Sequence, residues 1–348
     1  MKTIPRGTMK ALTVVACGAV GATILSSCCC LSSAPDTSIV ITADRSMDLL
    51  QQIHGTLVLY DHPTVTLVRL PEVAVSNFVA PDYIRTVAGP IDGAVLAHLS
   101  GDVLSYYQVA LWNLSEGTER TVLRRNESWF DGLSGNSIAL SADGTFVIFA
   151  AKASEGNTDY DQTILEVWDT RSTNLLFTID GVIDNGMSFV SNSTVFVYCA
   201  ATRRKRLDAA LQGPTEFGRF KDEECVPLVI ACDAVSKKKR FVHVGWHPCV
   251  SSDGTTMIID DSDRNACLVD LASGETKRTW VPDDFMGAVS LVGKDLLIYK
   301  GVMKSPERGY TIGIADLRTH TRQTIVEGVQ RRHIKSTVSF GTGSFPMP

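Results

Sequence analysis

The segment NSIALSADGTFVIFAA (residues 136–151), followed by TILEVWDTRSTNLLFTI (residues 163–179), decides the fold of this chain. In the first stretch, Asp143-Gly144 separates two β-type runs, and this step predicts a tight hairpin because Gly accepts positive φ without a Cβ clash. The second stretch places two more β-type runs on either side of the polar turn 169–172. The four runs together predict one four-stranded antiparallel sheet.

The pattern of a β-type run, a short polar turn and a second β-type run occurs six times. Each turn opens 37 to 64 residues after the previous one, which is the period range of propeller blades. The first unit has only three good strands, and we expect residues 333–340 to supply its inner strand, which would close a ring and remove exposed sheet edges. We therefore predict an all-β, six-bladed propeller of four-stranded antiparallel blades over residues 55–348, with seven blades as the alternative. The turns open at Arg69, Asn113, Asp169, Asp233, Asp270 and Asp316.

These units resemble the blades of TolB-like and tryptophan–aspartate-like propellers over roughly residues 55–340. Val167-Trp168-Asp169 is the one full Trp-Asp dipeptide, and the other turns carry Asn or Asp after different residues. The Gly-His dipeptide of true tryptophan–aspartate repeats is absent, which places the chain nearer the TolB-like group. The resemblance implies a six-bladed fold and leaves the chemistry open.

Composition narrows the classes of partner. The chain has 348 residues, of which 44% are hydrophobic and 20% are charged, enough for a large packed core. Its formal net charge of −5 argues against a dedicated nucleic-acid binder, which would show a basic footprint. The sequence contains no phosphate-binding loop, dinucleotide fingerprint or nucleophile elbow, so we expect no cofactor and assign no catalytic residue.

The N-terminus has the pattern of an export signal. Lys2, Arg6 and Lys10 precede an apolar run at 11–25 that is shorter than the ~20 residues needed to span a bilayer. The run ends in Leu25-Ser26-Ser27-Cys28, which resembles the lipobox of bacterial lipoproteins and implies cleavage before Cys28 and lipidation of its thiol. An ordinary cleaved signal or an uncleaved anchor is the alternative.

This resemblance sets the predicted domain boundaries and location. We expect a signal peptide at 1–27, a lipidated tether and lead-in at 28–54 with a helix at 47–53, and the propeller after it. Cys29 rather than Asp follows Cys28, so the family rule for inner-membrane retention does not apply and the outer membrane is the expected site.

The loops indicate which face of the propeller carries the binding surface. We letter the four strands of each blade a to d from the centre outward. In such a fold the a–b and c–d turns share one face, while the b–c and d–a connections share the other. Here most long connections are of the second kind. Loops on a rigid scaffold concentrate binding residues, and arginines and aromatics dominate contact energies at interfaces. A solvated insertion with aromatics packed on the blade is the alternative. The candidate interaction residues are Arg203, Arg204, Arg206, Phe217, Arg219, Phe220, Trp129, Phe130, Asp283 and Phe285.

Other constellations are better explained without a site. The stretch 261–265 begins like a calcium loop but lacks its Gly and Glu. His243 and His247 are four residues apart on a strand-and-turn stretch rather than a helix face, which disfavours zinc. The five cysteines after residue 30 have no metal-type spacing, so we predict no metal, and the basic run 237–240 is explained by a solvated hairpin tip.

Three functions remain open. The first is a non-enzymatic binding or scaffold module in the cell envelope, held to the membrane through lipidated Cys28 and binding a protein or other macromolecule, but not nucleic acid. The second is a hydrolase or lyase that uses the central channel, which would need several Asp, Glu, Asn or His residues on the inner strands near the channel mouth, where this sequence has few. The third is a structural or sensory envelope domain. The oligomeric state cannot be inferred from these residues.

Overall fold

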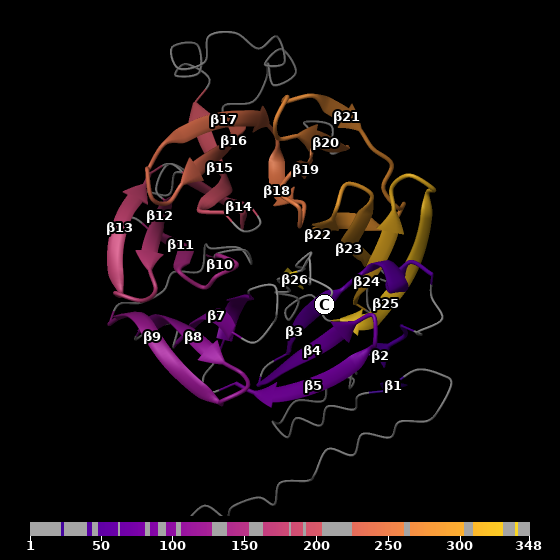
Figure 1. Ribbon diagram of the computed structural model, residues 1–348, viewed down its shortest axis with the longest axis horizontal. Helices are drawn as coiled ribbons and strands as arrows, with labels where there is room; N and C mark the ends of the chain where they lie inside the picture. Colours follow the sequence, from indigo (N-terminus) through magenta and orange to yellow (C-terminus); the bar gives the residue numbers. More distant parts are fainter. Residues whose placement is uncertain are drawn as a thin grey trace, which may run out of the picture.

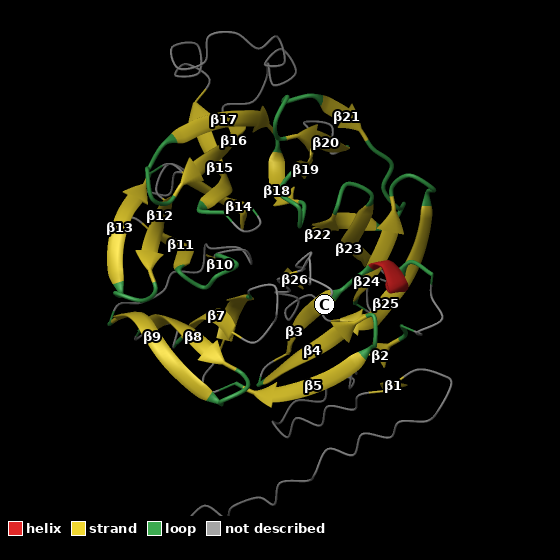
Figure 2. Cartoon of the chain, viewed as in Figure 1, coloured by secondary structure: helices red, strands yellow, loops and turns green. Residues whose placement is uncertain are grey.

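The computed structural model consists of sheets arranged around a common centre (Figure 1). It contains five four-stranded sheets and one six-stranded sheet, and every pairing between their strands is antiparallel. The one helix of the described chain is a short 3₁₀ turn (Figure 2). The residues that the structure describes are 22–23, 40–43, 48–61, 63–80, 84–89, 95–101, 106–126, 138–152, 163–180, 182–190, 193–203, 225–260, 265–302, 309–329 and 338–339.

The sheets are the blades of a propeller, and we number them in chain order with strands a to d from the centre outward. The prediction of six blades is confirmed, and the seven-blade alternative is wrong. Blade 1 is β26 (Val338–Ser339), β3 (Gly55–Asp61), β4 (Thr64–Leu70) and β5 (Ala74–Val79). Blade 2 is β6 (Ile84–Ala88), β7 (Val95–Ser100), β8 (Tyr107–Asn113) and β9 (Thr118–Arg125), and blade 3 is β10 (Ile138–Leu140), β11 (Phe146–Lys152), β12 (Thr163–Asp169) and β13 (Asn174–Ile179).

The second half of the ring repeats this order. Blade 4 is β14 (Val182–Phe189), β15 (Val195–Arg203), β16 (Cys225–Asp233) and β17 (Lys239–Val244). Blade 5 is β18 (Trp246–Val250), β19 (Thr256–Asp260), β20 (Ala266–Asp270) and β21 (Thr276–Arg278). Blade 6 is β22 (Phe285–Val292), β23 (Leu296–Val302), β24 (Tyr310–Asp316) and β25 (Thr321–Val329), and it is extended outward by β2 (Val40–Ile41) and β1 (Ala22–Thr23).

The core lies between the blades. Every residue of β24 is buried, because the middle of a blade has a neighbour on each side, whereas β5 at the outer edge is exposed or half-buried throughout. Ile148 and Leu165 of blade 3 pack with Phe196 and Tyr198 of blade 4 in one cluster, and similar clusters join other adjacent blades. Each junction is thus a small core of its own, and burial of apolar surface there stabilises the ring.

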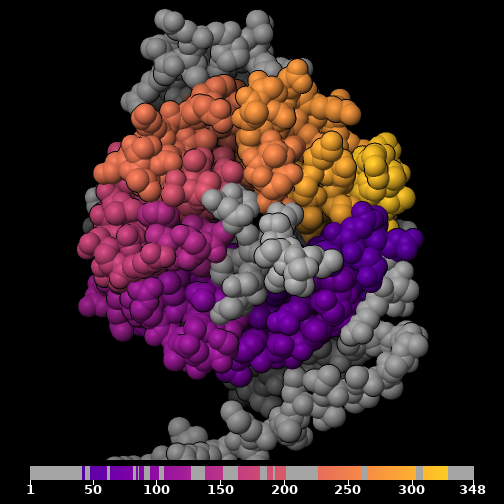
Figure 3. Space-filling model, in the orientation of Figure 1, coloured from indigo at the N-terminus to yellow at the C-terminus, as the bar shows by residue number. Residues whose placement is uncertain are grey.

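The ring is closed between blades 6 and 1, where the first and last blades of the chain meet (Figure 3). Strand β26 pairs with β3 through Val338 opposite Leu57 and Ser339 opposite Thr56, so the prediction that residues 333–340 supply the inner strand of the first blade is confirmed. This ladder is only two residues long in the described chain.

A second closure comes from residues 40–43 and 48–54, which we call the N-terminal strap. Its first part, β2, pairs with β25, and the backbone N–H groups of Thr42 and Ala43 both donate to Ile325 O, at 2.8 and 3.1 Å. The helix expected at 47–53 is the 3₁₀ turn Leu50–Gln52. Strap residues Leu49, Leu50 and Ile53 pack into a single cluster with apolar residues of blades 1 and 6. The strap therefore ties blade 6, which comes from near the end of the described chain, to blade 1, most of which comes from near its start.

The c–d turns owe their repeated sequence to a carboxylate or amide cap. Asp169 Oδ1 accepts hydrogen bonds from the N–H groups of Arg171 and Ser172, at 2.7 and 2.9 Å. The turns that open at Asn113, Asp233, Asp270 and Asp316 show the same two bonds. Asx side chains commonly stabilise turns in this way.

The fourth residue after each turn-opening residue adopts a left-handed conformation. In the six turns its φ lies between 54° and 74°. Glycine has no steric cost in this region, whereas other L residues pay about 1–2 kcal/mol. These residues are Val73, Gly117, Thr173, Lys237, Gly274 and His320.

This equivalence predicts opposite effects at two matched positions. Gly274→Thr should destabilise the fold by about 1 kcal/mol through the backbone alone, since a Cβ at Gly274 would meet no atom within 4 Å. Thr173→Gly, at an exposed position, should be stabilising, by less because Gly loses more backbone entropy on folding. Urea denaturation of both variants measures the two changes, and effects of the same sign would contradict the assignment.

The capped turns also predict acid sensitivity. The pKa values of Asp169, Asp233 and Asp270 are lowered mainly by the hydrogen bond that each carboxylate accepts from the backbone N–H of the residue three positions later in the chain. A carboxyl whose folded pKa lies below its unfolded value of about 3.9 stabilises the fold above that pH and loses this contribution as pH falls through the folded pKa. We expect the urea midpoint to fall steeply below about pH 4.

The matched control replaces these three residues by asparagine, which already occupies the equivalent position at Asn113. The triple variant should show a shallower dependence of the urea midpoint on pH between 6 and 3, because the amide keeps the turn bonds without titrating. An unchanged pH dependence would mean that other carboxyls control acid unfolding.

Candidate functional site

The two faces of the propeller differ in what connects their strands. The a–b and c–d turns form one face, which we call the short-turn face, and the b–c and d–a connections form the other, the loop face. The connection from β15 to β16 spans residues 204–224 and that from β11 to β12 spans 153–162, both on the loop face. No a–b or c–d turn of blades 3 to 6 reaches the length of either.

Three of the predicted interaction residues lie in the described part of the loop face. Arg203 is the last residue of β15, Asp283 is exposed in the turn before β22, and Phe285 begins that strand. Phe285 is half-buried, with its ring 6.2 Å from that of Tyr299, so it takes part in packing between blades 5 and 6. Outside the described residues lie Arg204, Arg206, Phe217, Arg219, Phe220, Trp129 and Phe130.

Asp284, which is not among the predicted interaction residues, lies in the connection from blade 5 to blade 6 and makes its contacts with blade 6. Its Oδ1 forms an ion pair with Arg322 and lies 3.5 Å from the hydroxyl of Tyr299. Burial, with the nearby Asp284 charge, raises the pKa of Tyr299 to about 12. A Cβ at Gly301 would lie 2.7 Å from Asp284 Oδ2, so this glycine leaves room for the carboxylate. The pair positions the d–a connection beside the exposed Asp283.

His247 is the most unusual residue of the loop face. Its φ is +51°, and it precedes Pro248 in a bulge where the pairing of β18 with β19 shifts between Trp246 and Cys249. A positive φ in a residue other than glycine is rare, and bulges often redirect a side chain beside a functional site. The His247 side chain is 50% exposed, and its Nδ1 donates to Asp260 Oδ2 at 2.8 Å.

This bond defines what His247 can do chemically. In the neutral ring, a carboxylate on Nδ1–H selects the tautomer in which Nε2 carries the lone pair and can accept, the arrangement of a general base or ligand-binding imidazole. His243 is different, since its Nε2 lies 2.7 Å from Thr276 Oγ1 and its Nδ1 2.8 Å from Val244 O. The two histidines therefore have separate partners. Among the described residues, no group of three or more His, Cys, Asp or Glu is placed to hold a metal ion.

The inner strands next to His247 are bulged as well. The pairing of β14 with β15 shifts between Ile183 and Met187, and that of β22 with β23 shifts between Phe285 and Gly287. The Gly186 backbone lies close to His247, because a Cβ added at Gly186 would be 3.5 Å from His247 Cα. Blades 4, 5 and 6 thus present three neighbouring irregular strand starts on the loop face.

The short-turn face, by contrast, is occupied by contacts between blades. Arg120 of β9 donates to the carbonyl of Thr170 in the next blade, and Arg240 of β17 donates to Leu271 O at 3.2 Å. The two contacts occupy equivalent positions in the repeat. Each arginine pairs across its own c–d ladder with the residue two places before the turn-opening residue of that blade. Each acceptor carbonyl belongs to the residue that directly follows the turn-opening residue of the next blade. We call these contacts the turn latches.

Two of the left-handed turn residues make latches in the reverse direction. Lys237 lies 5.4 Å from the Phe177 ring centre and donates to Leu176 O at 3.3 Å, in the preceding blade. His320 stacks on Trp280 with ring centres 5.0 Å apart. The basic run 237–240 is therefore more than a solvated hairpin tip, because Lys237 and Arg240 join blade 4 to both its neighbours.

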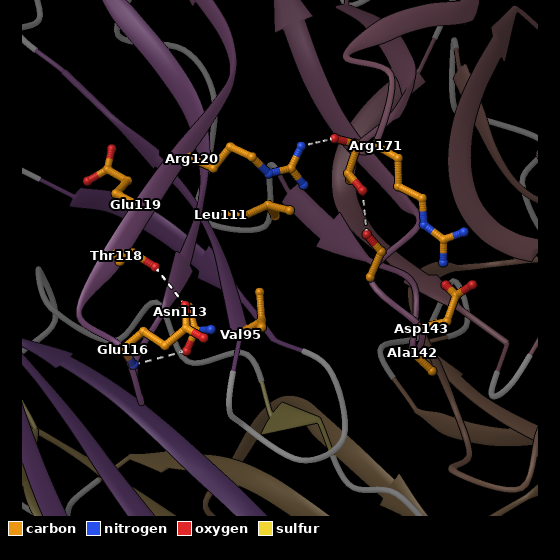
Figure 4. A pocket seen from close by; sticks show the side chains of 12 residues that line it. Val95, Leu111, Asn113, Glu116, Thr118, Glu119, Arg120, Ala142, Asp143 and Arg171 are labelled. Carbon is orange, nitrogen blue, oxygen red and sulfur yellow. Dashed lines mark hydrogen bonds between the residues drawn. The ribbon is translucent and has the colours of Figure 1, made fainter.

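A groove of about 690 Å³ lies on this face between blades 2 and 3 (Figure 4). Arg120 crosses it to Thr170, and Glu116 accepts from the Thr118 hydroxyl at 3.2 Å. Burial opposes ionisation of Asp143, but hydrogen bonds from Thr145 and Ser141, helped by the Arg171 charge, lower its pKa overall. Each of these charged groups has a partner among the residues that line the groove or border it, and Arg120 forms a latch across it, so the groove belongs to the latch system.

Comparison with known proteins gives the fold. No protein-family model matches the chain, and no curated protein matches it in sequence. TolB from Acinetobacter baumannii is similar in structure, with a TM-score of 0.54 and 15% identity over 83% of this chain and 67% of TolB. Oligogalacturonate lyase from Vibrio parahaemolyticus has a TM-score of 0.49 and 9% identity over 85% of this chain and 83% of the lyase. At these identities the likeness to TolB shows a shared propeller fold.

No helix in the described part of the chain has the length and apolar character to cross a bilayer.

Proposed function

We propose that this protein is a lipid-anchored β-propeller of the cell envelope that binds a protein partner through its loop face, without catalysis. The observation that carries the proposal is the unequal use of the two faces. The short-turn face is engaged in turn latches between blades, whereas the loop face carries the long connections, the exposed Asp283 and the 47% exposed side chain of Met286. Such mixed, loop-borne surfaces on a rigid scaffold suit protein recognition.

The anchor part of the proposal rests on the sequence. Cys28 follows a charged and then apolar N-terminal segment in a lipobox-like context. A single lipid-modified N-terminus would keep the propeller at a membrane without a spanning helix. The partner is then another component of the same envelope.

The test of the partner surface compares charge reversals on the two faces. Arg203, Arg204 and Arg206 are changed to glutamate in one variant, and Lys238, Lys239 and Lys277, which are exposed away from the loop face, in the control. Both variants change the net charge by the same amount. We expect capture of the envelope partner by the loop-face variant to weaken by about tenfold or more, equivalent to about 1.4 kcal/mol, and the control to bind normally. Equal effects of the two variants would exclude this surface.

A second candidate, a hydrolase or lyase, is favoured by His247 alone. Its strained backbone and its bond to Asp260 match a general base. If this candidate is correct, purified protein should turn over a member of a peptide and glycoside panel, and His247→Gln should lower the rate about 100-fold while His243→Gln has no effect. Turnover that survives His247→Gln, or no turnover at all, would remove this candidate.

A further inference from the structure

The N-terminal strap fixes the point at which the chain leaves the propeller. Strand β2 adds to the outer side of β25 (Figure 1). Strand β1 pairs with the outer side of β2, but its residues precede Cys28, so the proposed cleavage would remove it and leave β2 at the rim of blade 6. Thr42 Oγ1 donates to Thr324 O at 3.2 Å, in addition to the two backbone bonds to Ile325. Ile41, Leu50 and Ile53 have no exposed surface. These contacts make the strap part of the folded body rather than part of a free tether.

The strap therefore shortens the free tether that would follow Cys28. From Cys28 to Val40 is 12 residues (40 − 28), which span at most about 40 Å when fully extended. Without the strap, the tether would reach Gly55 after 27 residues (55 − 28) and could span about 90 Å. A folded body of this size has a radius of gyration of roughly 20 Å, so its opposite rims are separated by roughly 50 Å.

We propose that the rim of blades 6 and 1 faces a lipid surface, with blade 3 pointing away from it; this rests on the proposed lipidation of Cys28. The membrane is the partner of this rim, and attachment there leaves the loop face and the short-turn face both uncovered. The loop face then meets its partner beside the membrane rather than through it.

Two equivalent turn positions allow the orientation to be measured. Thr319 in blade 6 and Ser172 in blade 3 are both exposed and both lie three places after the turn-opening aspartate. Each is changed to cysteine, labelled with a fluorescent donor, and examined in lipidated full-length protein on vesicles of phosphatidylethanolamine and phosphatidylglycerol that carry an acceptor lipid. Cys29, Cys30 and Cys225 are changed to serine in all samples.

The remaining thiols should not react with the label. Cys199, Cys232 and Cys267 are buried, and burial raises the pKa of Cys199 and Cys249 to about 12, so little thiolate is present at neutral pH. A sample without an introduced cysteine verifies that labelling is confined to the chosen position.

We expect energy transfer from position 319 to be several-fold stronger than from position 172. Inserting about 20 Gly and Ser residues between Asp36 and Thr37 lengthens the tether without touching the strap, and should reduce this contrast. Ile41→Asp, which releases the strap, should also reduce the contrast in energy transfer between the two positions. If Ile41→Asp fails to fold, the insertion variant still tests the orientation.

The outcomes separate this inference from the proposed function. Equal transfer from both positions in vesicle-bound protein would overturn the orientation while leaving the anchor intact. If the protein does not bind vesicles, or if the Cys28→Ser variant binds them as well as the unchanged protein does, the lipid anchor itself is overturned. Stronger transfer from position 172 would place the opposite rim at the membrane.

Discussion

The whole ring depends on blade 1, because its inner strand β26 comes from the end of the described chain whereas its other three strands come from near the start. Each of the other five blades takes its four radial strands from one consecutive stretch of chain, so its sheet forms at little cost in loop-closure entropy. Here the closure is made by the two-residue ladder of β26 on β3 and by the strap. So short a ladder adds few hydrogen bonds, and the main contribution comes from the cluster that unites Leu50 and Ile53 with Leu57 of blade 1 and Ile312 of blade 6.

The remaining junctions share a second constraint, the geometry of the c–d turns. An Asx cap and a left-handed fourth residue give each turn the same shape, and this places its carbonyls and its fourth side chain beside the neighbouring blade. Arg120 and Arg240 use the carbonyls, while Lys237 and His320 use the side-chain position to reach Phe177 and Trp280. The same sequence feature that marks the repeat therefore also joins the blades, which is why the short-turn face is regular and the loop face can vary.

The repeat, the blade count and the closing strand could be predicted from the sequence, because a cap residue and β-type runs are local signals. The turn cap at Asp169 and the Asp143-Gly144 hairpin can be recognised in the sequence without knowledge of any long-range contact. The latches could not be predicted, since a solvated lysine run and one whose Lys237 covers a ring in the next blade look alike in sequence. The contacts of Asp284 and of the strap could not be predicted for the same reason, because Arg322 and Ile325 are far from them along the chain. At the candidate site, Asp283 and Phe285 were placed correctly on the loop face, but the packing role of Phe285 depends on Tyr299.

His247 illustrates how departures from the repeat can locate function. Among the described residues other than glycine, Val73, Thr173, Lys237 and His320 have positive φ in the repeated turn, where the fold itself demands it. His247 has the same strain outside any such turn, before a proline that further restricts it, and at the start of an inner strand. The inner strands of blades 2, 4 and 6 are bulged near their starts as well, so a bulge at this place recurs round the ring, whereas the positive φ of His247 does not. Local rules are usually broken where function requires it, so this backbone conformation points to the loop face on grounds independent of loop length.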